Sequence, residues 1–424
     1  MPRKAVSGIM LTMLLIGVLM LTFNAQQVKA ESISIMVPRN YPTIQEAINN
    51  ANEGDIIFVS PGTYYENVTL DRSISLIGMS GHNTIIDGGG TAFGAVVYVT
   101  ADDINVSNFT VQNSRKDGVG IWLNRCRNCT VSGNNVKDCG VFGGIGGTGI
   151  ELDYCKGCTV DRNNASNNNG GIMLAFSQNC TVYGNSVNRN YKGIDTVYCS
   201  DCIFIGNTLS NNEDLGIHMF APCYCLFRDN NITGSNQNFG VHGDKLSHFV
   251  NDVDISNMIN GKPIVYLLNR HGLTVAPLTY PTIGYLAIVN STNIIIENLT
   301  LGHNGEGVLF AYVNNSIIRK VGTSNNEYGI YMVNCDNCTV NENIATNNFY
   351  GIRLDCSYNC TVTGNTATNN NVGIRLSNCL NCTVSGNIER LFWMEWWFWA
   401  TVIAGTGVLA VGVYFLKKRK SPNL

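Results

Sequence analysis

The chain has 424 residues, of which 13% are charged and 45% are hydrophobic, and its net charge is −3. This composition excludes an intrinsically disordered chain, which combines high net charge with few apolar residues. The near-neutral charge also excludes nucleic acid as a partner, because phosphate binding requires a basic surface.

Residues 1–30 have the pattern of a secretory signal peptide. Arg3 and Lys4 precede an apolar run over residues 9–23, and Ala30 ends a small-residue cleavage site. We therefore expect export of the chain and cleavage before Glu31. An uncleaved N-terminal anchor is the alternative.

Residues 31–94 are expected to form an N-terminal cap and the first coils. The segment from Thr43 to Ile48 has helical spacing, and short apolar runs follow from Gly54 onward. A helix over the first coil protects a sheet edge that would otherwise be exposed.

Residues 95–250 and 285–390 consist of copies of one repeat. GIELDYCKGCTVDRNNASNNNG begins at Gly149, and similar copies begin at Gly171 and Gly193, each 22 residues after the one before. Further copies are predicted to open at Gly120, Gly216, Gly240, Gly307, Gly329, Gly351 and Gly373. A fixed period of this length indicates a solenoid of stacked units.

The repeat predicts an all-β fold, a right-handed parallel β-helix solenoid of about 22-residue coils. Apolar residues alternate with polar ones in short runs bounded by turn residues, and no copy has a helix-length stretch. Leucine-rich repeats have a similar length but need a regular leucine consensus. Asparagines recur fourteen residues after the opening glycine, as in Asn163, Asn185 and Asn207, and we expect them to stack as a hydrogen-bonded ladder.

Two segments depart from the repeat. Residues 251–284 lose the period and contain several prolines, so we expect an irregular excursion there. Residues 391–416 are expected to form one C-terminal transmembrane helix, because 396–416 is uncharged and long enough to cross a bilayer.

The charge pattern around that helix predicts its orientation. Tryptophans precede it and four cations follow it, which favours a basic cytoplasmic tail over 417–424 and a single-pass protein with its ectodomain on the extracellular or periplasmic side. A buried core helix is the alternative.

The stretch TIQEAINNANEGDIIFVSPGTYYENVTLDRSISLIG, the repeated N-x-TV-x-GN pattern and the segment NGKPIVYLLN carry a family resemblance. They resemble the right-handed parallel β-helix superfamily of carbohydrate-binding and sugar-hydrolysing proteins, and most of all its NosD-like and archaeal surface branch. NosD-like proteins are associated with periplasmic copper handling, so the resemblance implies a copper ion, and a calcium ion is the other metal considered. The catalytic motifs of pectin methylesterases and polygalacturonases are absent, which favours a protein that is not an enzyme.

Sixteen cysteines recur at one corner of the predicted coils. In an exported protein they favour disulfides, and the candidates are the C-x-x-C residues Cys126, Cys129, Cys155, Cys158, Cys199, Cys202, Cys335, Cys338, Cys379 and Cys382. A buried ladder of free thiols and a thiolate metal site remain as alternatives.

Polar residues at the third and fifth positions of the repeat are expected to point outward on one face. Glu151, Asp195, His218 and His242 are candidate acid and base groups, and Asp153 and Asp244 lie in the same row. His218, Met219 and His242 are candidate metal ligands. The alternative is a polar strand face without chemistry.

These features predict a membrane-anchored cell-surface protein that binds carbohydrate or another envelope polymer without catalysis. Trp122, Tyr331, Arg353 and Arg375 are the expected contacts, and Asn67, Asn105, Asn231 and Asn298 are candidate glycosylation sites in N-x-S/T motifs. A polysaccharide lyase or hydrolase, a copper-handling accessory protein and a structural stalk are the other hypotheses.

Overall fold

The computed structural model describes residues 32–90, 94–140, 143 and 146–391. The expected signal peptide lies outside the described residues, as do the cytoplasmic tail and all of the expected transmembrane helix beyond Leu391. Within the described part of the chain, no helix is long and apolar enough to span a membrane.

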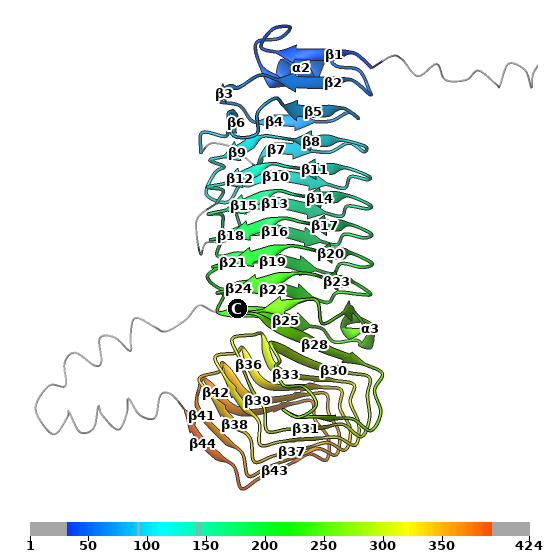
Figure 1. The fold of residues 1–424 in the computed structure, drawn as a ribbon, viewed down its shortest axis with the longest axis vertical. Coiled ribbons are helices and arrows are strands. Elements are labelled where there is room, and N and C mark those ends of the chain that lie inside the picture. Colours follow the sequence, from blue (N-terminus) through cyan, green and yellow to red (C-terminus); the bar gives the residue numbers. More distant parts are fainter. Residues whose placement is uncertain (1–31, 91–93, 141–142, 144–145, 392–424) are drawn as a thin grey trace, which may run out of the picture.

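The described residues form a β-solenoid whose strands pair in parallel from coil to coil (Figure 1). The first stack of coils has three sheet faces. A ten-stranded sheet contains β1 (Ser34–Val37), β2 (Ile56–Val59), β5 (Ser75–Gly78), β8 (Asn105–Ser107), β11 (Thr130–Ser132), β14 (Thr159–Asp161), β17 (Thr181–Tyr183), β20 (Ile203–Ile205), β23 (Leu226–Arg228) and β26 (Asp252–Val253). An eight-stranded sheet contains β4 (Val68–Leu70), β7 (Ala95–Val99), β10 (Val119–Asn124), β13 (Thr148–Asp153), β16 (Gly170–Ala175), β19 (Lys192–Val197), β22 (Leu215–Phe220) and β25 (Gln237–His242).

A fifteen-stranded sheet runs through both stacks. Its strands in the first stack are β3 (Gly62–Tyr64), β6 (Thr84–Asp87), β9 (Thr110–Gln112), β12 (Asn135–Lys137), β15 (Asn164–Ser166), β18 (Ser186–Asn188), β21 (Thr208–Ser210), β24 (Asn231–Thr233) and β27 (Met258–Ile259). It continues with β28 (Lys262–Leu268), β30 (Tyr285–Val289), β33 (Glu306–Ala311), β36 (Tyr328–Val333), β39 (Tyr350–Asp355) and β42 (Val372–Ser377).

The second stack adds two smaller sheets. One contains β29 (Thr274–Val275), β31 (Ile295–Glu297), β34 (Ile317–Arg319), β37 (Thr339–Asn341), β40 (Thr361–Thr363) and β43 (Thr383–Ser385). The other contains β32 (Thr300–Gly302), β35 (Gly322–Ser324), β38 (Ile344–Thr346), β41 (Thr366–Asn370) and β44 (Ile388–Leu391).

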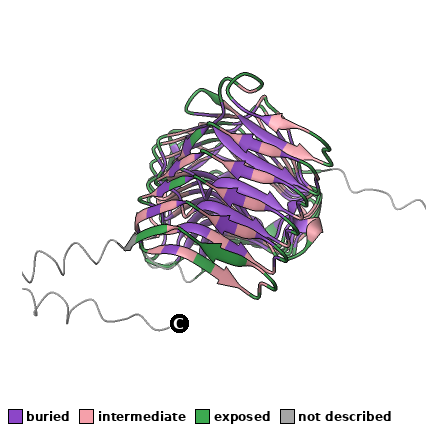
Figure 2. Ribbon diagram, turned by 90° about the horizontal axis from the view of Figure 1, so that it is seen from below, coloured by how far each residue is buried: buried purple, intermediate pink, exposed green. Residues whose placement is uncertain are grey.

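The core runs along the inside of the coils because every second strand residue points inward (Figure 2). Val131, Val160 and Val182 stack in register and are fully or almost fully buried. The helix α2 (Ile44–Asn50) packs against β1, β2 and β4, with Ile44, Ala47 and Ile48 buried. It therefore covers the first coil, as the sequence predicts.

The expected asparagine ladder is present in the interior. Asn163, Asn185 and Asn207 are at most 1% exposed, and each side chain donates to the amide oxygen of the next at 2.9 to 3.1 Å. The same side chains bond to main-chain atoms of neighbouring coils. The ladder thus satisfies backbone groups at the tight turn that no sheet can reach.

The segment 251–284 connects the two stacks. The strand β27 continues the fifteen-stranded sheet, the chain then turns at Gly261, and β28 pairs with β27 antiparallel. The strand β28 next pairs in parallel with β30. The strand that follows the opening glycine of each copy therefore lies in the eight-stranded sheet in the first stack and in the fifteen-stranded sheet in the second. The second stack runs in a different direction from the first (Figure 1).

Two sequence predictions about the last coil before this junction are wrong. Gly240 does not open a copy, because Ile217 pairs with Phe239 and Asn238 takes the glycine position opposite Gly216. His242 therefore lies at the fifth position, opposite Phe220, and not at the third.

The described residues contain none of the predicted disulfides. All sixteen cysteines lie in described residues and are free thiols, and twelve of them are buried. In Cys126 and Cys129, as in the other pairs, both side chains turn inward, and each thiol donates to main-chain carbonyls of its own coil and the preceding one. The structure thus corresponds to the ladder of free thiols that the sequence left as an alternative.

Thiol labelling is expected to follow this burial. In the folded protein only the half-buried Cys223, Cys356, Cys379 and Cys382 should react with a thiol reagent, and the other twelve only after unfolding. Burial raises the pKa of Cys139 to about 11, so that thiol stays protonated and unreactive. Mass spectrometry after alkylation without reductant tests this, and two cysteines per bridge that stay unlabelled in the unfolded chain would contradict it.

Candidate functional site

A hollow of about 410 Å³ lies where the two stacks meet. Its lining from the first stack comes from β22, β25 and the turns after β19, β22 and β25, and its lining from the second stack comes from β36 and the residue before it. The lining residues are Tyr198, His218, Phe220, Ala221, His242, Gly243, Asp244, Glu327, Tyr328 and Tyr331. We call this the junction hollow.

Asp195 and His218 form a hydrogen-bonded pair at its edge. They are register neighbours on β19 and β22, and Nδ1 of His218 lies 2.9 Å from Oδ1 of Asp195. Lys192 Nζ lies 3.4 Å from the other carboxylate oxygen. Burial alone would raise the pKa of Asp195, but the hydrogen bond and charge of His218, with Lys192, hold it below its ordinary value.

A second cluster connects the two stacks under the hollow. Nε2 of His242 lies 3.3 Å from Oε1 of Glu306 and 3.7 Å from Oε2 of Glu327. Glu306 is fully buried, and its Oε2 accepts from the Tyr285 hydroxyl at 2.7 Å and from the Val241 amide at 3.3 Å. Burial raises the pKa of Glu306 to about 8 and also raises the pKa of Glu327. Burial lowers the pKa of His242 to about 3.

The sequence did not identify Glu306 and Glu327 as candidates. They belong to copies that follow the junction, so only the change of sheet between β27 and β28 brings them to His242. No period in the sequence predicts that contact.

Outward side chains of the eight-stranded sheet form one row that leads to the hollow. Tyr98, Trp122, Glu151, Met173, Asp195 and His218 are register neighbours in successive coils. Glu151 is separated from Asp195 by Met173, so the four predicted acid–base candidates do not form one cluster. Burial, and then the neighbouring Asp153, raises the pKa of Glu151 to about 7.

An aromatic ladder lies beside this row. Tyr154, Phe176, Tyr198 and Phe220 are 41% to 54% exposed, and their ring centroids are 4.8 to 5.5 Å apart. The last two rings line the junction hollow. The first three rings are the sixth residues of their copies of the repeat, so the sequence carries a signal for the ladder.

The predicted contacts of the second stack form a row that begins at the hollow, which Tyr331 lines, and continues away from it. Tyr331, Arg353 and Arg375 are register neighbours on β36, β39 and β42. Arg353 bonds to Asp355 at 2.9 Å and lies over the Tyr350 ring at 4.9 Å. Tyr331 is only 7% exposed, whereas Arg375 is exposed at the end of the row.

Trp122 lies apart from these residues. It is on β10 in the first stack, where its Nε1 donates to Asp153 at 3.1 Å and its ring packs against Tyr98 at 5.0 Å. It therefore belongs to the same row as Asp195 and His218, several coils away.

The predicted metal ligands do not come together. Met219 is fully buried in the core, because it occupies an inward position of β22, while the rings of His218 and His242 are 5.1 Å apart outside. In the described part of the chain, no group of three or more His, Cys, Asp or Glu side chains is arranged to hold a metal ion.

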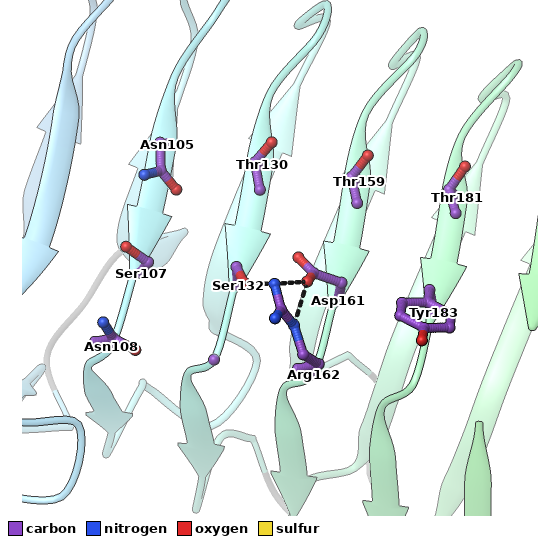
Figure 3. A pocket seen from close by; sticks show the side chains of 11 residues that line it. Asn105, Ser107, Asn108, Thr130, Ser132, Thr159, Asp161, Arg162, Thr181 and Tyr183 are labelled. Atoms are coloured by element: carbon purple, nitrogen blue, oxygen red, sulfur yellow. Dashed lines mark hydrogen bonds and ion pairs between the residues drawn. The ribbon is translucent and has the colours of Figure 1, made fainter. Parts of the chain in front are cut away.

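The ten-stranded sheet has a polar groove of about 950 Å³ on its outer face (Figure 3). Thr130, Thr159 and Thr181 form its row of hydroxyls, and Asp161 pairs with Arg162 inside it. Of the candidate glycosylation sites, Asn105 lines this groove and is half-buried. Exposed sites are Asn67, Asn231 and Asn298.

The fold and the repeat define a parallel β-helix protein, and the comparisons with known proteins agree. Residues 94–257 match the family described as "Right handed beta helix region", and residues 255–389 match "Periplasmic copper-binding protein (NosD)". Each match covers less than half of the chain, and both agree with the parallel β-helix fold of the structure.

One known protein is similar in sequence to part of the chain. A cell surface glycoprotein of Methanothermus fervidus is 24% identical over 134 residues, which are 31% of this chain and 22% of that protein, so the match spans about a fifth of the relative.

Solved structures resemble the chain at low sequence identity. The catalytic unit of the GH87 α-1,3-glucanase from Streptomyces thermodiastaticus has 14% identity and a TM-score of 0.42, covering 85% of this chain and 70% of that one. The surface adhesin PfbA of Streptococcus pneumoniae has 13% identity and a TM-score of 0.41, covering 85% and 91%.

Proposed function

We propose that this is a cell-surface protein that binds a carbohydrate or related envelope polymer along one face. That binding face consists of the outward row on the eight-stranded sheet, the aromatic ladder beside it and the junction hollow. It continues with an Arg–Tyr cluster, which consists of Tyr331, Tyr350, Arg353 and Arg375. The aromatic ladder is the observation that carries the proposal.

The ladder is an apolar strip that folding leaves uncovered. Its first three rings stack face to face at nearly the spacing of the coils, and Phe220 stands edge-on to Tyr198, so the strip presents a regular row of aromatic edges along the solenoid axis. Aromatic rings bury much area with little loss of conformational freedom, and an exposed strip of them marks an interaction site. An extended polymer with alternating apolar and polar faces fits this strip and the polar row beside it.

The Arg–Tyr cluster indicates the polarity of the ligand. Arg375 Nη1 donates to Tyr350 at 3.3 Å and remains exposed, so its other donors are free to reach hydroxyl or carboxylate oxygens. This favours a polymer rich in hydroxyls, with or without acidic groups.

The surface location rests on the ends of the chain and on a relative. The signal-peptide and transmembrane patterns of residues 1–30 and 391–416 predict export and a single-pass anchor. The similarity to a cell surface glycoprotein supports the same location.

The test replaces the exposed rings with the residue that other coils carry there. Asn334 and Asn378 occupy the ladder position in the second stack with the same left-handed backbone, so Phe176→Asn and Tyr198→Asn fit without added strain. Each ring removes on the order of 1–2 kcal/mol of contact, so the double variant is expected to bind a retained polysaccharide about 30-fold more weakly. Affinity electrophoresis against neutral and acidic polysaccharides measures this.

A matched control lies on another face. Tyr183 is 48% exposed on the ten-stranded sheet, and Asn341 occupies the equivalent position of the second stack. Tyr183→Asn is expected to leave binding unchanged. Equal loss in both variants would contradict the assignment of the face, and no retention of any polysaccharide would favour a structural stalk instead.

A further inference from the structure

We propose that the junction hollow hydrolyses glycosidic bonds of the polymer on the binding face, with His218 as general base, Asp195 as its positioning residue and Glu327 as general acid. The inference rests on the proposed function, because it needs a polymer held on that face. It adds an activity that polymer binding alone does not supply.

The first step of the argument is the orientation of His218. Asp195 accepts the Nδ1–H at 2.9 Å, so the lone pair of the neutral ring lies on Nε2. Asp195 remains ionised because the hydrogen bond from His218 and the nearby Lys192 ammonium group stabilise its charge. The His218 side chain is 21% exposed and lines the hollow, so Nε2 can accept a proton from a water molecule there.

The second step is a proton donor across the hollow. Glu327 directly precedes β36 on the opposite wall and is 33% exposed, so a ligand in the hollow can reach it. Burial raises its pKa, whereas that of Asp195 is lowered. Two carboxyl groups whose environments displace their pKa values in opposite directions can serve as proton donor and as base partner in one site.

The third step is the floor between them. His242 has its pKa lowered to about 3 and Glu306 has its pKa raised to about 8, so both are neutral near pH 7. Within the described residues, His242 Nε2 and Glu306 Oε1 are buried and lie 3.3 Å apart, but neither atom makes a hydrogen bond of normal geometry. Buried polar atoms of this kind need a partner, which a water molecule or a sugar hydroxyl in the hollow supplies.

The reaction is a single displacement. Water attacks the anomeric carbon while His218 Nε2 takes one of its protons, and the new C–O bond forms. Glu327 donates its proton to the glycosidic oxygen as that bond breaks, which leaves one sugar chain with a new reducing end and the other with a hydroxyl. Solvent then returns the proton from His218 to Glu327, so the net change is addition of one water.

The test uses the full chain and the polysaccharides that it retains. Reducing ends are expected to appear with inverted anomeric configuration, and His218→Gln and Glu327→Gln are expected to slow their release at least 100-fold at saturating polysaccharide. Asp195→Asn is expected to move the acidic limb of the pH–rate profile, which a purely structural role would not do. Because all three changes preserve side-chain size, equal melting temperatures confirm that the variants fold.

A matched control is Glu342→Gln, an exposed carboxyl near Lys320 away from the hollow, for which the rate is expected to stay unchanged. Retention without cleavage would overturn this inference while the proposed function stands, and loss of both would overturn both. An unsaturated product or a retained anomeric configuration would overturn the hydrolytic step.

Discussion

Replacing Asn207 with Ala is expected to lower the free energy of unfolding by about 4 kcal/mol. Its Oδ1 accepts from the main-chain and side-chain nitrogens of Asn185 at 3.0 Å, and its Nδ2 donates to Val182 O and to Asn230 Oδ1 at 2.9 Å. All of these atoms belong to buried residues. Alanine can make none of these hydrogen bonds. The partner atoms would then be buried without a hydrogen bond and without access to water.

Urea denaturation followed by circular dichroism measures this change. Asn236→Ala is the matched control, because Asn236 is exposed and contributes only a main-chain bond to Glu213. The control is expected to stay within about 0.5 kcal/mol of the wild type. If both variants lost the same small amount, the interior asparagines would not hold the coils together.

Replacing Glu306 with Gln is expected to remove a pH dependence of stability from the junction. The folded-state pKa of Glu306 is raised to about 8, so the folded protein binds more protons than the unfolded chain between about pH 4.5 and 8. Wild-type stability therefore falls as pH rises through this window. The glutamine has no proton to lose, and its advantage at pH 9 is on the order of 5 kcal/mol.

His242 acts in the opposite direction at lower pH. Its folded-state pKa is lowered to about 3, so its contribution to stability is present above about pH 6.5 and is lost as pH falls toward 3. The clearest comparison is therefore between pH 6.5 and 9. Melting temperatures of wild type, Glu306→Gln and the exposed control Glu342→Gln measure it, and parallel curves for wild type and Glu306→Gln would show that Glu306 is not a buried acid.

The sequence predicted the solenoid because equivalent residues recur once in each coil at a nearly constant spacing. Ile150, Ile172 and Ile194 are spaced by 22 residues and lie in register, so spacing alone assigns their pairing and their inward direction. Asn163, Asn185 and Asn207 were predicted as a ladder for the same reason, since identical residues at one turn must stack.

Only the part of the site that lies in the first stack was predicted from the sequence. Asp195 and His218 follow the period, so their outward direction and proximity were predictable. Glu306 and Glu327 were not, because the sheet change at β27 and β28 depends on an antiparallel turn at Gly261 that resembles any other loop in sequence. The sequence predicted His242 at the third position of its coil, whereas it occupies the fifth, because Asn238 and not a glycine opens that coil.

The cysteine pairs show a different limit. Spacing indicates that Cys126 and Cys129 share a turn, but spacing is the same for a bridge and for two inward thiols. The direction of the side chains decides between them, and here both turn into the core, where their thiols donate to main-chain carbonyls.

The dependence of affinity on ligand length tests the binding face most directly. We expect calorimetric titration with size-fractionated oligosaccharides of a retained polysaccharide to show affinity that rises with length, because each added sugar contacts the next ring of the ladder from Tyr154 toward Phe220. The rise should stop once the ladder and the hollow are filled. Equal affinity for a single sugar and for the longest oligosaccharide would contradict an extended face.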